Sequence, residues 1–226
     1  MVRPANGQYD RERVGRLFDG IADAETGTGQ GATRYDGNIP HIAAQMALEK
    51  LGLSTDDVLL DVGTGTGDMA IAAAHNCRRV IGIDISLKSL EHARRKAEQK
   101  GIDDLVFAYG SFEEPCAELD LASYGITRIL AVYSLHHLPD PLKKQGLLTM
   151  AGLLRRPGRT VIGDIMFFEE PHGQPEAFDE VGYDGGETDF PARAEHLIEW
   201  LEQTGAGVHL EQVHPLVGVV TADYPR

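Results

Sequence analysis

The sequence predicts an α/β protein with seven strands in a mostly parallel sheet that is covered by helices on both faces. Three observations support this fold class. Short apolar runs alternate with helical stretches between residues 58 and 167, a glycine-rich turn at 63–67 follows the first run, and the last two runs follow each other directly. Such alternation is typical of βαβ units. Because a parallel pair needs a long crossover, the last two strands should form an antiparallel hairpin.

The chain has 226 residues, the size of one domain with a single core. Its first part is predicted to contain two helices, at 11–24 and 40–51, separated by a glycine-rich break at 26–31. The first helix carries apolar side chains at helical spacing, namely Val14, Leu17, Phe18 and Ile21. We expect residues 1–55 to form a helical cap or lid on a single domain that spans residues 1–226.

The remaining elements follow in order along the chain. Strands are predicted at 58–62, 80–84, 105–109, 126–132, 160–167, 208–213 and 216–221, and helices at 68–75, 87–100, 142–154 and 192–203. The stretch between the fifth strand and the last helix is polar and is predicted to be a loop. No internal repeat interrupts this order.

The net charge of −14 is unevenly distributed along the chain. Between Thr160 and Tyr224 the only Lys or Arg is Arg193, whereas surfaces that bind nucleic acid or anionic membranes need clustered basic side chains. We therefore expect no nucleic-acid partner and no membrane partner. No apolar run approaches the roughly 18 residues of a membrane helix, and residues 1–10 lack an apolar signal-peptide core. A cytoplasmic location is expected.

The strongest motif is DVGTGTG at 61–67, between the first predicted strand and the helix after it. Glycine lets the backbone turn tightly and lets a ligand approach where a Cβ would block it. The next predicted strand ends in Asp84, whose carboxylate can accept hydrogen bonds from both hydroxyls of a ribose. This order predicts a nucleoside-binding site. A second glycine-rich stretch, at 26–29, has no strand before it and is expected to be a hinge.

The glycine spacing indicates which nucleoside compound is bound. Dinucleotide sites usually carry GxGxxG, whereas the spacing here is GxGxG with an acidic residue two positions earlier, which disfavours a nicotinamide dehydrogenase. The segment 61–67 instead resembles the first motif of the class I, Rossmann-like, S-adenosylmethionine-dependent methyltransferases. The resemblance implies S-adenosylmethionine as cofactor and S-adenosylhomocysteine as product. It also implies the strand order 3-2-1-4-5-7-6.

In that family the loop contacts the methionine part of the cofactor, and the acid after the second strand holds the ribose. The resemblance therefore implies cofactor contacts from Asp61, Gly63, Thr64, Gly65, Gly67 and Asp84. The further contacts that it implies are Ile85, Ser86, Gly110, Ser111, Phe112, Tyr133 and Tyr35. The family often has Asp at the position of Ser111, so backbone groups or Glu113 are expected to bind the adenine here.

The segment 132–138 resembles the fourth-strand region of small-molecule methyltransferases. A sulfonium methyl is already electrophilic, so the protein must chiefly align the reactants, and a base is needed only for a protonated nucleophile. His136 and His137 are candidates for the base or for orienting the substrate, because imidazole titrates near neutral pH. Tyr133 is a candidate for orienting a substrate group, and Asp164 for facing the pocket. A packed structural role is the alternative for each.

No metal site is predicted, because no third ligand stands at a telling distance from His136 and His137. The segment 169–189 carries eight carboxylates and no Lys or Arg. It is either a solvated loop, or a surface that attracts a cationic substrate or docks a protein partner. A homodimer is also compatible with the sequence.

The predicted function is methyl transfer from S-adenosylmethionine to a small molecule, such as an amine or another cationic or neutral metabolite. The fourth predicted strand is not followed by Asn-Pro-Pro-Tyr, which in the family marks methylation of planar amide-type nitrogens. Two alternatives stay open at this point. One is other chemistry on S-adenosylmethionine, such as hydrolysis of the sulfonium, and the other is a partner-dependent subunit that binds S-adenosylmethionine.

Overall fold

The computed structural model of the chain describes residues 9–24, 37–169, 175–186 and 188–226. One sheet connects them in the order β3-β2-β1-β4-β5-β8-β7, and the short strand β6 pairs with the end of β5. The strands are β1 (Val58–Val62), β2 (Arg79–Asp84), β3 (Leu105–Tyr109), β4 (Arg128–Val132), β5 (Gly158–Phe167), β6 (Ala192–Arg193), β7 (Gly207–His214) and β8 (Val217–Tyr224). The predicted strand order is confirmed, with β7 and β8 as the predicted sixth and seventh strands.

The pairing directions are also as predicted. Strands β3, β2, β1, β4 and β5 are parallel to their neighbours, whereas β8 is antiparallel to both β5 and β7. Every residue of β1 is buried, because a parallel sheet is covered on both faces. The edge strand β7 instead mixes exposed and half-buried positions.

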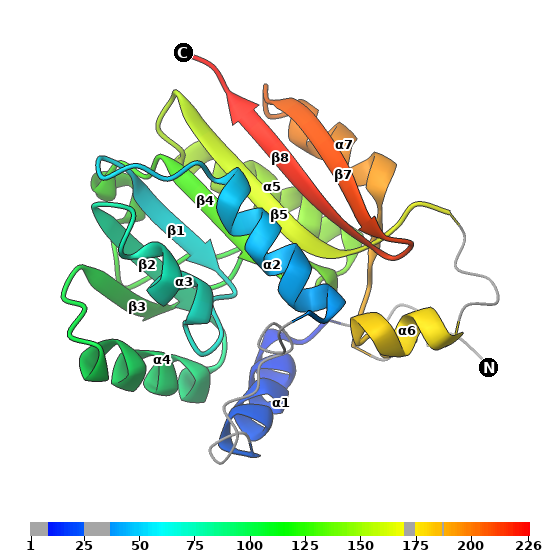
Figure 1. Cartoon of the computed structure of the whole chain (residues 1–226), viewed down its shortest axis with the longest axis horizontal. Helices are drawn as coiled ribbons and strands as arrows, with labels where there is room; N and C mark the ends of the chain where they lie inside the picture. The colour runs from blue at the N-terminus through cyan, green and yellow to red at the C-terminus, as the bar shows by residue number, and fades with distance from the viewer. Residues whose placement is uncertain (1–8, 25–36, 170–174, 187) are drawn as a thin grey trace.

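Helices cover both faces of the sheet (Figure 1). They are α1 (Arg11–Ala24), α2 (Ile39–Lys50), α3 (Asp68–Ala73), α4 (Leu87–Gln99), α5 (Asp140–Leu153), α6 (Pro175–Val181) and α7 (Ala194–Glu202), with 3-10 turns η3 (Leu121–Tyr124) and η4 (Leu135–His137). One face packs against α2, α3 and α4, and the other packs against α5 and α7. The expected fold class is therefore confirmed.

The two N-terminal helices have different positions. Helix α2 belongs to the layer on the sheet, since Ala43 and Ala47 are fully buried and a Cβ on Gly163 of β5 would lie 3.1 Å from the Ala43 carbonyl oxygen. Helix α1 lies beyond the carboxyl ends of the parallel strands and contacts α4 (Figure 1). Among the described residues of the expected cap 1–55, α1 thus lies at the carboxyl edge of the sheet, whereas α2 packs on its face.

Two predictions about the second half of the chain were wrong in detail. Residues 175–181 form α6 instead of a loop, with Pro175 at its first position, where its missing N–H has no intrahelical role. Residues 192–193 pair with Met166 and Phe167 of β5, so the last helix begins at Ala194. The glycine-rich break at 26–31 lies outside the described residues. In the parts that the structure describes, no helix has the length and apolarity needed to cross a membrane.

Candidate active site

A cavity of about 480 Å³ lies at the carboxyl ends of β1, β2 and β4. Ligands of open α/β sheets bind at this edge. Helix α1 forms one wall through Val14, Leu17, Phe18, Ile21 and Ala22. Val181, Asp184 and Asp189 belong to another wall, far along the chain from the glycine turn. The volume is that of a small-molecule site, which is usually about 300–1,000 Å³.

The glycine turn between β1 and α3 contributes the floor of this cavity. Gly63, Gly65 and Gly67 have φ values of 73°, 53° and 81°, in the left-handed region that favours glycine. A Cβ on Gly63 would lie 2.3 Å from the Cβ of Ser134, and one on Gly67 would lie 2.9 Å from Phe107, whereas Gly65 has nothing within 4 Å. Gly63 and Gly67 are thus needed for close packing. Gly65 leaves open space, and Gly67 lies outside the cavity wall.

Asp84 lies at the end of β2 in the cavity wall, and only 9% of its surface is exposed. Its Oδ2 accepts the N–H of Gly65 at 2.7 Å, and its Oδ1 accepts the N–H of Ser86 at 2.8 Å. Burial raises the pKa of Asp84, although these backbone hydrogen bonds oppose the shift. Because each carboxylate oxygen has two lone pairs, Asp84 can still accept hydrogen bonds from ribose hydroxyls.

Asp61 is the second buried carboxylate beside the turn. Its Oδ2 accepts the hydroxyl hydrogen of Thr64 at 2.6 Å. Burial raises the pKa of Asp61 to about 7, and the charge of Asp84 adds to this shift. Asp61 therefore changes charge near neutral pH, and a cationic group bound in the cavity would favour its ionised form.

The loop after β3 forms the predicted adenine side. Gly110, Ser111 and Phe112 line the cavity, as the resemblance implied, but Glu113 does not. The Ser111 hydroxyl accepts the N–H of Glu114 at 3.1 Å, and the Glu114 carboxylate accepts a hydrogen bond from Arg11 of α1 at 2.6 Å. Helix α1 is therefore tied to this loop.

Ile85 and Ser86 have different positions, although both were expected to contact the cofactor. Ile85 lines the cavity, whereas Ser86 is fully buried outside its wall. The Ser86 hydroxyl accepts the N–H of Ser89 and donates to Asp19 of α1 at 2.8 Å. Ser86 therefore caps α4 and anchors α1. Tyr35 lies outside the described residues.

Tyr133 follows β4 directly and lines the cavity. Its φ of 49° is the one positive value among the described non-glycine residues. Such strain often accompanies a functional site. The hydroxyl oxygen is buried and finds no hydrogen-bond partner within the described parts of the chain. Burial raises the pKa of Tyr133, so its hydroxyl stays protonated and available as a donor to a ligand in the cavity.

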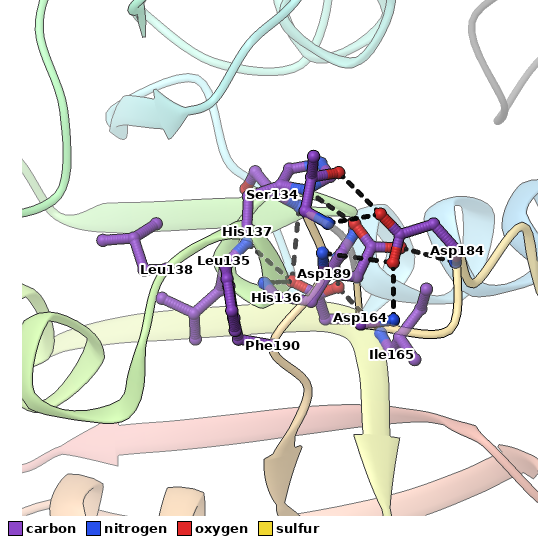
Figure 2. A network of polar contacts seen from close by, with 12 residues as sticks. Ser134, Leu135, His136, His137, Leu138, Asp164, Ile165, Asp184, Asp189 and Phe190 are labelled. Carbon is purple, nitrogen blue, oxygen red and sulfur yellow. Dashed lines mark hydrogen bonds and ion pairs between the residues drawn. The ribbon is translucent and has the colours of Figure 1, made fainter. Parts of the chain in front are cut away.

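Asp164 was expected to face the pocket, but the structure places it beneath the cavity wall, 1% exposed. Figure 2 shows its carboxylate surrounded by donors from η4. Its Oδ2 accepts the N–H groups of Leu135 and His136 at 2.7 and 3.2 Å, and its Oδ1 contacts Nδ1 of His136. Asp164 therefore holds His136 in place from outside the cavity lining.

Asp189 is a site residue that the sequence analysis missed. It is 4% exposed, and its Oδ1 lies 2.9 Å from Nδ1 of His137 and 3.6 Å from Nε2 of His136 (Figure 2). Its Oδ2 accepts the N–H of Asp184 at 3.0 Å. The acidic segment is therefore not a uniformly solvated loop. From the sequence, no third potential metal ligand was expected beside His136 and His137, and Asp189 is one. One ligand atom from each of these three side chains lies within 4.8 Å of the others.

The two histidines have opposite electrostatic environments. For His136, burial disfavours the charged form, but the charge and hydrogen bond of Asp164, together with the charge of Asp189, raise its pKa. The pKa of Asp164 is lowered, because His136 outweighs burial. For His137, burial and the neighbouring His136 lower the pKa. His136 is therefore the cationic partner of Asp164, and His137 is neutral near pH 7.

A methyltransferase-domain family model matches residues 53–202 of the chain. An uncharacterized methyltransferase of Bacillus pumilus is 30% identical over 174 residues, which cover 73% of this chain and 76% of that protein. The 27-O-demethylrifamycin SV methyltransferase of Amycolatopsis mediterranei is 36% identical over 125 residues, which cover 54% of this chain and 44% of that protein. The crystal structure of the cyclase SpnF has a TM-score of 0.73 at 15% identity, covering 95% and 96% of the two chains.

The family match includes the whole parallel part of the sheet, from β1 to β5, and extends through α7. The similarity to the Bacillus pumilus protein covers most of both chains. These two findings agree with the family that the glycine turn and Asp84 indicated. The chain therefore belongs to the class I methyltransferases, the enzymes that use S-adenosylmethionine as methyl donor.

Proposed function

We propose that the enzyme methylates a small molecule whose nucleophile begins protonated, such as a hydroxyl group. One observation carries the proposal: the glycine turn and a neutral histidine beside a carboxylate, His137, line the same cavity. Bound S-adenosylmethionine supplies an electrophilic methyl group, so the protein must align the acceptor and receive its proton. The related rifamycin methyltransferase, which is named for a small-molecule acceptor, supports this class of substrate.

The residues at the cofactor end fit S-adenosylmethionine. The space above Gly65 would receive the methionine part, and Asp84 would bind the ribose hydroxyls. The backbone of 110–112 would border the adenine. Asp61, whose pKa lies near 7, would be ionised by a cationic group placed beside it.

His137 is the proposed general base. Asp189 beside Nδ1 favours the tautomer that carries the proton there, which leaves Nε2 to accept the proton of the acceptor. The contact is close but is not aligned as a hydrogen bond, and such catalytic contacts often tighten only when substrate binds. His136, paired with Asp164, would act as a fixed cation, and the Tyr133 hydroxyl would donate a hydrogen bond to the acceptor.

The cavity walls favour a neutral acceptor with an apolar body. Most of the α1 wall is aliphatic or aromatic, and Leu138 and Val181 add apolar surface. The acidic residues of 169–189 in the wall already have partners. Asp184 accepts hydrogen bonds from Gly186 and Thr188, and Asp189 faces the histidines. Among the described residues of this segment, the carboxylates in the wall are thus already compensated, which disfavours the amine acceptor considered from the sequence.

A second candidate is a reaction other than methyl transfer. The observation in its favour is that SpnF, which shares the fold with a TM-score of 0.73, is named as a cyclase. The fold alone therefore does not determine the chemistry. Consumption of S-adenosylmethionine in the absence of any acceptor would be the signature of sulfonium hydrolysis.

The first experiment is calorimetric titration of wild type and Asp84→Ala with S-adenosylhomocysteine. Loss of hydrogen bonds to a charged group costs about 1.5–3 kcal/mol, so binding should weaken about 10–100-fold. The second is incubation with a metabolite extract and trideuteromethyl S-adenosylmethionine, followed by mass spectrometry. A labelled small molecule supports the proposal. Label found only on protein or RNA contradicts it, and cofactor consumption without label supports the second candidate.

A further inference from the structure

Lys143 of α5 is a fully buried ammonium outside the cavity wall, with 1% of its surface exposed. Its three N–H donors are all used. Nζ donates to the carbonyl oxygens of Leu138 and Phe190 and, at 3.1 Å, to the carboxylate of Asp140. A buried charge is normally retained only with such partners. Neither a contact with ligand nor a free lone pair is left for Lys143 in catalysis.

The two carbonyl oxygens that accept from Lys143 belong to two segments that are far apart in sequence. Leu138 directly follows His137, and Phe190 directly follows Asp189, so Lys143 binds the backbone immediately after each member of the His137–Asp189 pair. The N–H of Phe190 also donates to the carbonyl of His136 at 2.6 Å. These hydrogen bonds join η4 to the segment just before β6, about 50 residues later in the chain.

We propose that Lys143 is a positioning residue, whose buried ammonium holds the segments of His137 and Asp189 together so that the carboxylate stays beside the imidazole. The inference rests on the proposed role of His137 as base. A shift of about 1 Å in such a pair can cost on the order of 10²-fold in rate, so the register of two distant segments matters for catalysis.

The charged groups around Lys143 balance one another. Burial lowers the pKa of Lys143, whereas Asp140 and Asp164 favour its charged form. Asp164 and Asp189 are buried carboxylates, and His136 and Lys143 are the buried cations on this side of the sheet. His196 faces Asp140 at 3.9 Å from the exposed side. Without the ammonium, Asp189 should move away from His137. Because the Asp189 contact raises the pKa of His137 against burial and His136, its loss should lower that pKa further.

The test compares Lys143→Met with Asp140→Asn. The first removes the ammonium but keeps an unbranched apolar stem, and the second removes its partner at the half-exposed end while leaving both carbonyl contacts. Side-chain NMR titration of His137 should show a lower pKa in Lys143→Met, because the Asp189 contact is lost, and the wild-type pKa in Asp140→Asn. Titration with S-adenosylhomocysteine should show unchanged affinity in both, because the cofactor end does not contact Lys143. With an identified acceptor, kcat of Lys143→Met should fall about 10²-fold.

A lower melting temperature with an unchanged His137 titration would make Lys143 a structural residue only and would overturn the inference. If Lys143→Met does not fold, the wild-type protein decides. A buried lysine ammonium that donates three hydrogen bonds should give a slowly exchanging NH₃⁺ signal that is perturbed in Asp140→Asn, and the absence of this signal contradicts the positioning role. These readings need no acceptor, so they are independent of whether His137 proves to be the base.

Discussion

The cavity has a cofactor end and an end where we propose that the methyl acceptor binds (the acceptor end), and the two are built in different ways. At the cofactor end, residues 61–67 and 84–86 come from two adjacent strands, and the contacts are mainly backbone groups around one carboxylate. At the acceptor end, His137 follows β4, Asp164 lies in β5, Asp189 precedes β6, and Lys143 lies in α5. Their contacts are buried charges that pair across long separations in sequence.

The difference indicates which end of the cavity distinguishes this enzyme from its relatives. A binding site made of backbone groups needs only a short sequence motif. Many relatives can therefore share this motif while they methylate different acceptors. A cluster of paired charges depends on several segments at once, and a change in any of them alters the acceptor site. Substitutions at the acceptor end should therefore affect chemistry without affecting cofactor binding, and substitutions at the cofactor end should do the reverse.

The largest expected effect is at the acceptor end. His137→Gln removes the proposed base but keeps a side chain of similar polarity, and kcat should fall by about 10²–10⁴-fold. Affinity for S-adenosylhomocysteine should be unchanged by calorimetry. His209→Gln, at a histidine that is 71% exposed on β7, is the matched control and should have wild-type kcat. A wild-type rate in His137→Gln would remove the base from the mechanism.

The next largest effect is on stability, and it distinguishes Gly63 from Gly65. Gly63→Ala adds left-handed strain and a Cβ that overlaps Ser134, for a combined cost of about 2–5 kcal/mol. At about 2–4 °C per kcal/mol, its melting temperature should fall by roughly 10 °C. Gly65→Ala has the strain without the overlap, so it should be more stable than Gly63→Ala and yet bind S-adenosylhomocysteine less well. Equal stability of the two variants would contradict this assignment.

The pH–rate profile should report the acceptor end. Because the pKa of His137 is lowered by burial and by His136, the base stays neutral to a pH below the ordinary histidine range. The rate should therefore hold its plateau on lowering the pH to about 6.5 and decline only below it. The profile is measured as kcat at saturating cofactor. A decline that begins well above neutral pH would point to a different base.

A smaller pH effect should appear in stability at the cofactor end. The folded-state pKa of Asp61, about 7, lies above its ordinary value of 3.8, so its stabilising contribution is complete below pH 3.8 and is lost as the pH rises to 7. Asp61→Asn keeps the acceptor oxygen for Thr64 but does not titrate. Relative to wild type, its melting temperature should rise by a few degrees between about pH 4 and pH 7. A parallel pH dependence of both proteins would show that Asp61 is not the titrating group.

Metal removal is expected to have no effect. Each ring nitrogen of His136 already faces a carboxylate, Asp164 at Nδ1 and Asp189 at Nε2. The protonated imidazole therefore compensates the negative charge of these carboxylates without a metal ion. Dialysis against a chelator should leave the rate unchanged. A rate that falls on dialysis and returns with added Zn²⁺ or Mn²⁺ would show instead that His136, His137 and Asp189 hold a metal ion.

Much of the cofactor end could be predicted because its signals are local. The order of strands and helices follows from the period of apolar residues, and α1, β1 and β3 have the predicted bounds. The turn at 63–67 and Asp84 also lie where expected. The wrong details, α6 and β6, lie in the polar stretch after β5, where no apolar period stands out.

The sequence by itself determined the α/β fold, the strand order that its family resemblance implied, and the nucleoside turn, since each depends on neighbouring residues. Only the tertiary structure decided that Ser86 anchors α1, that Asp164 lies beneath the cavity, and that Asp189 meets His137. The physical reason is that a buried ion pair depends on where the backbone brings two side chains together. In sequence, Asp189 is one of eight similar carboxylates between 169 and 189.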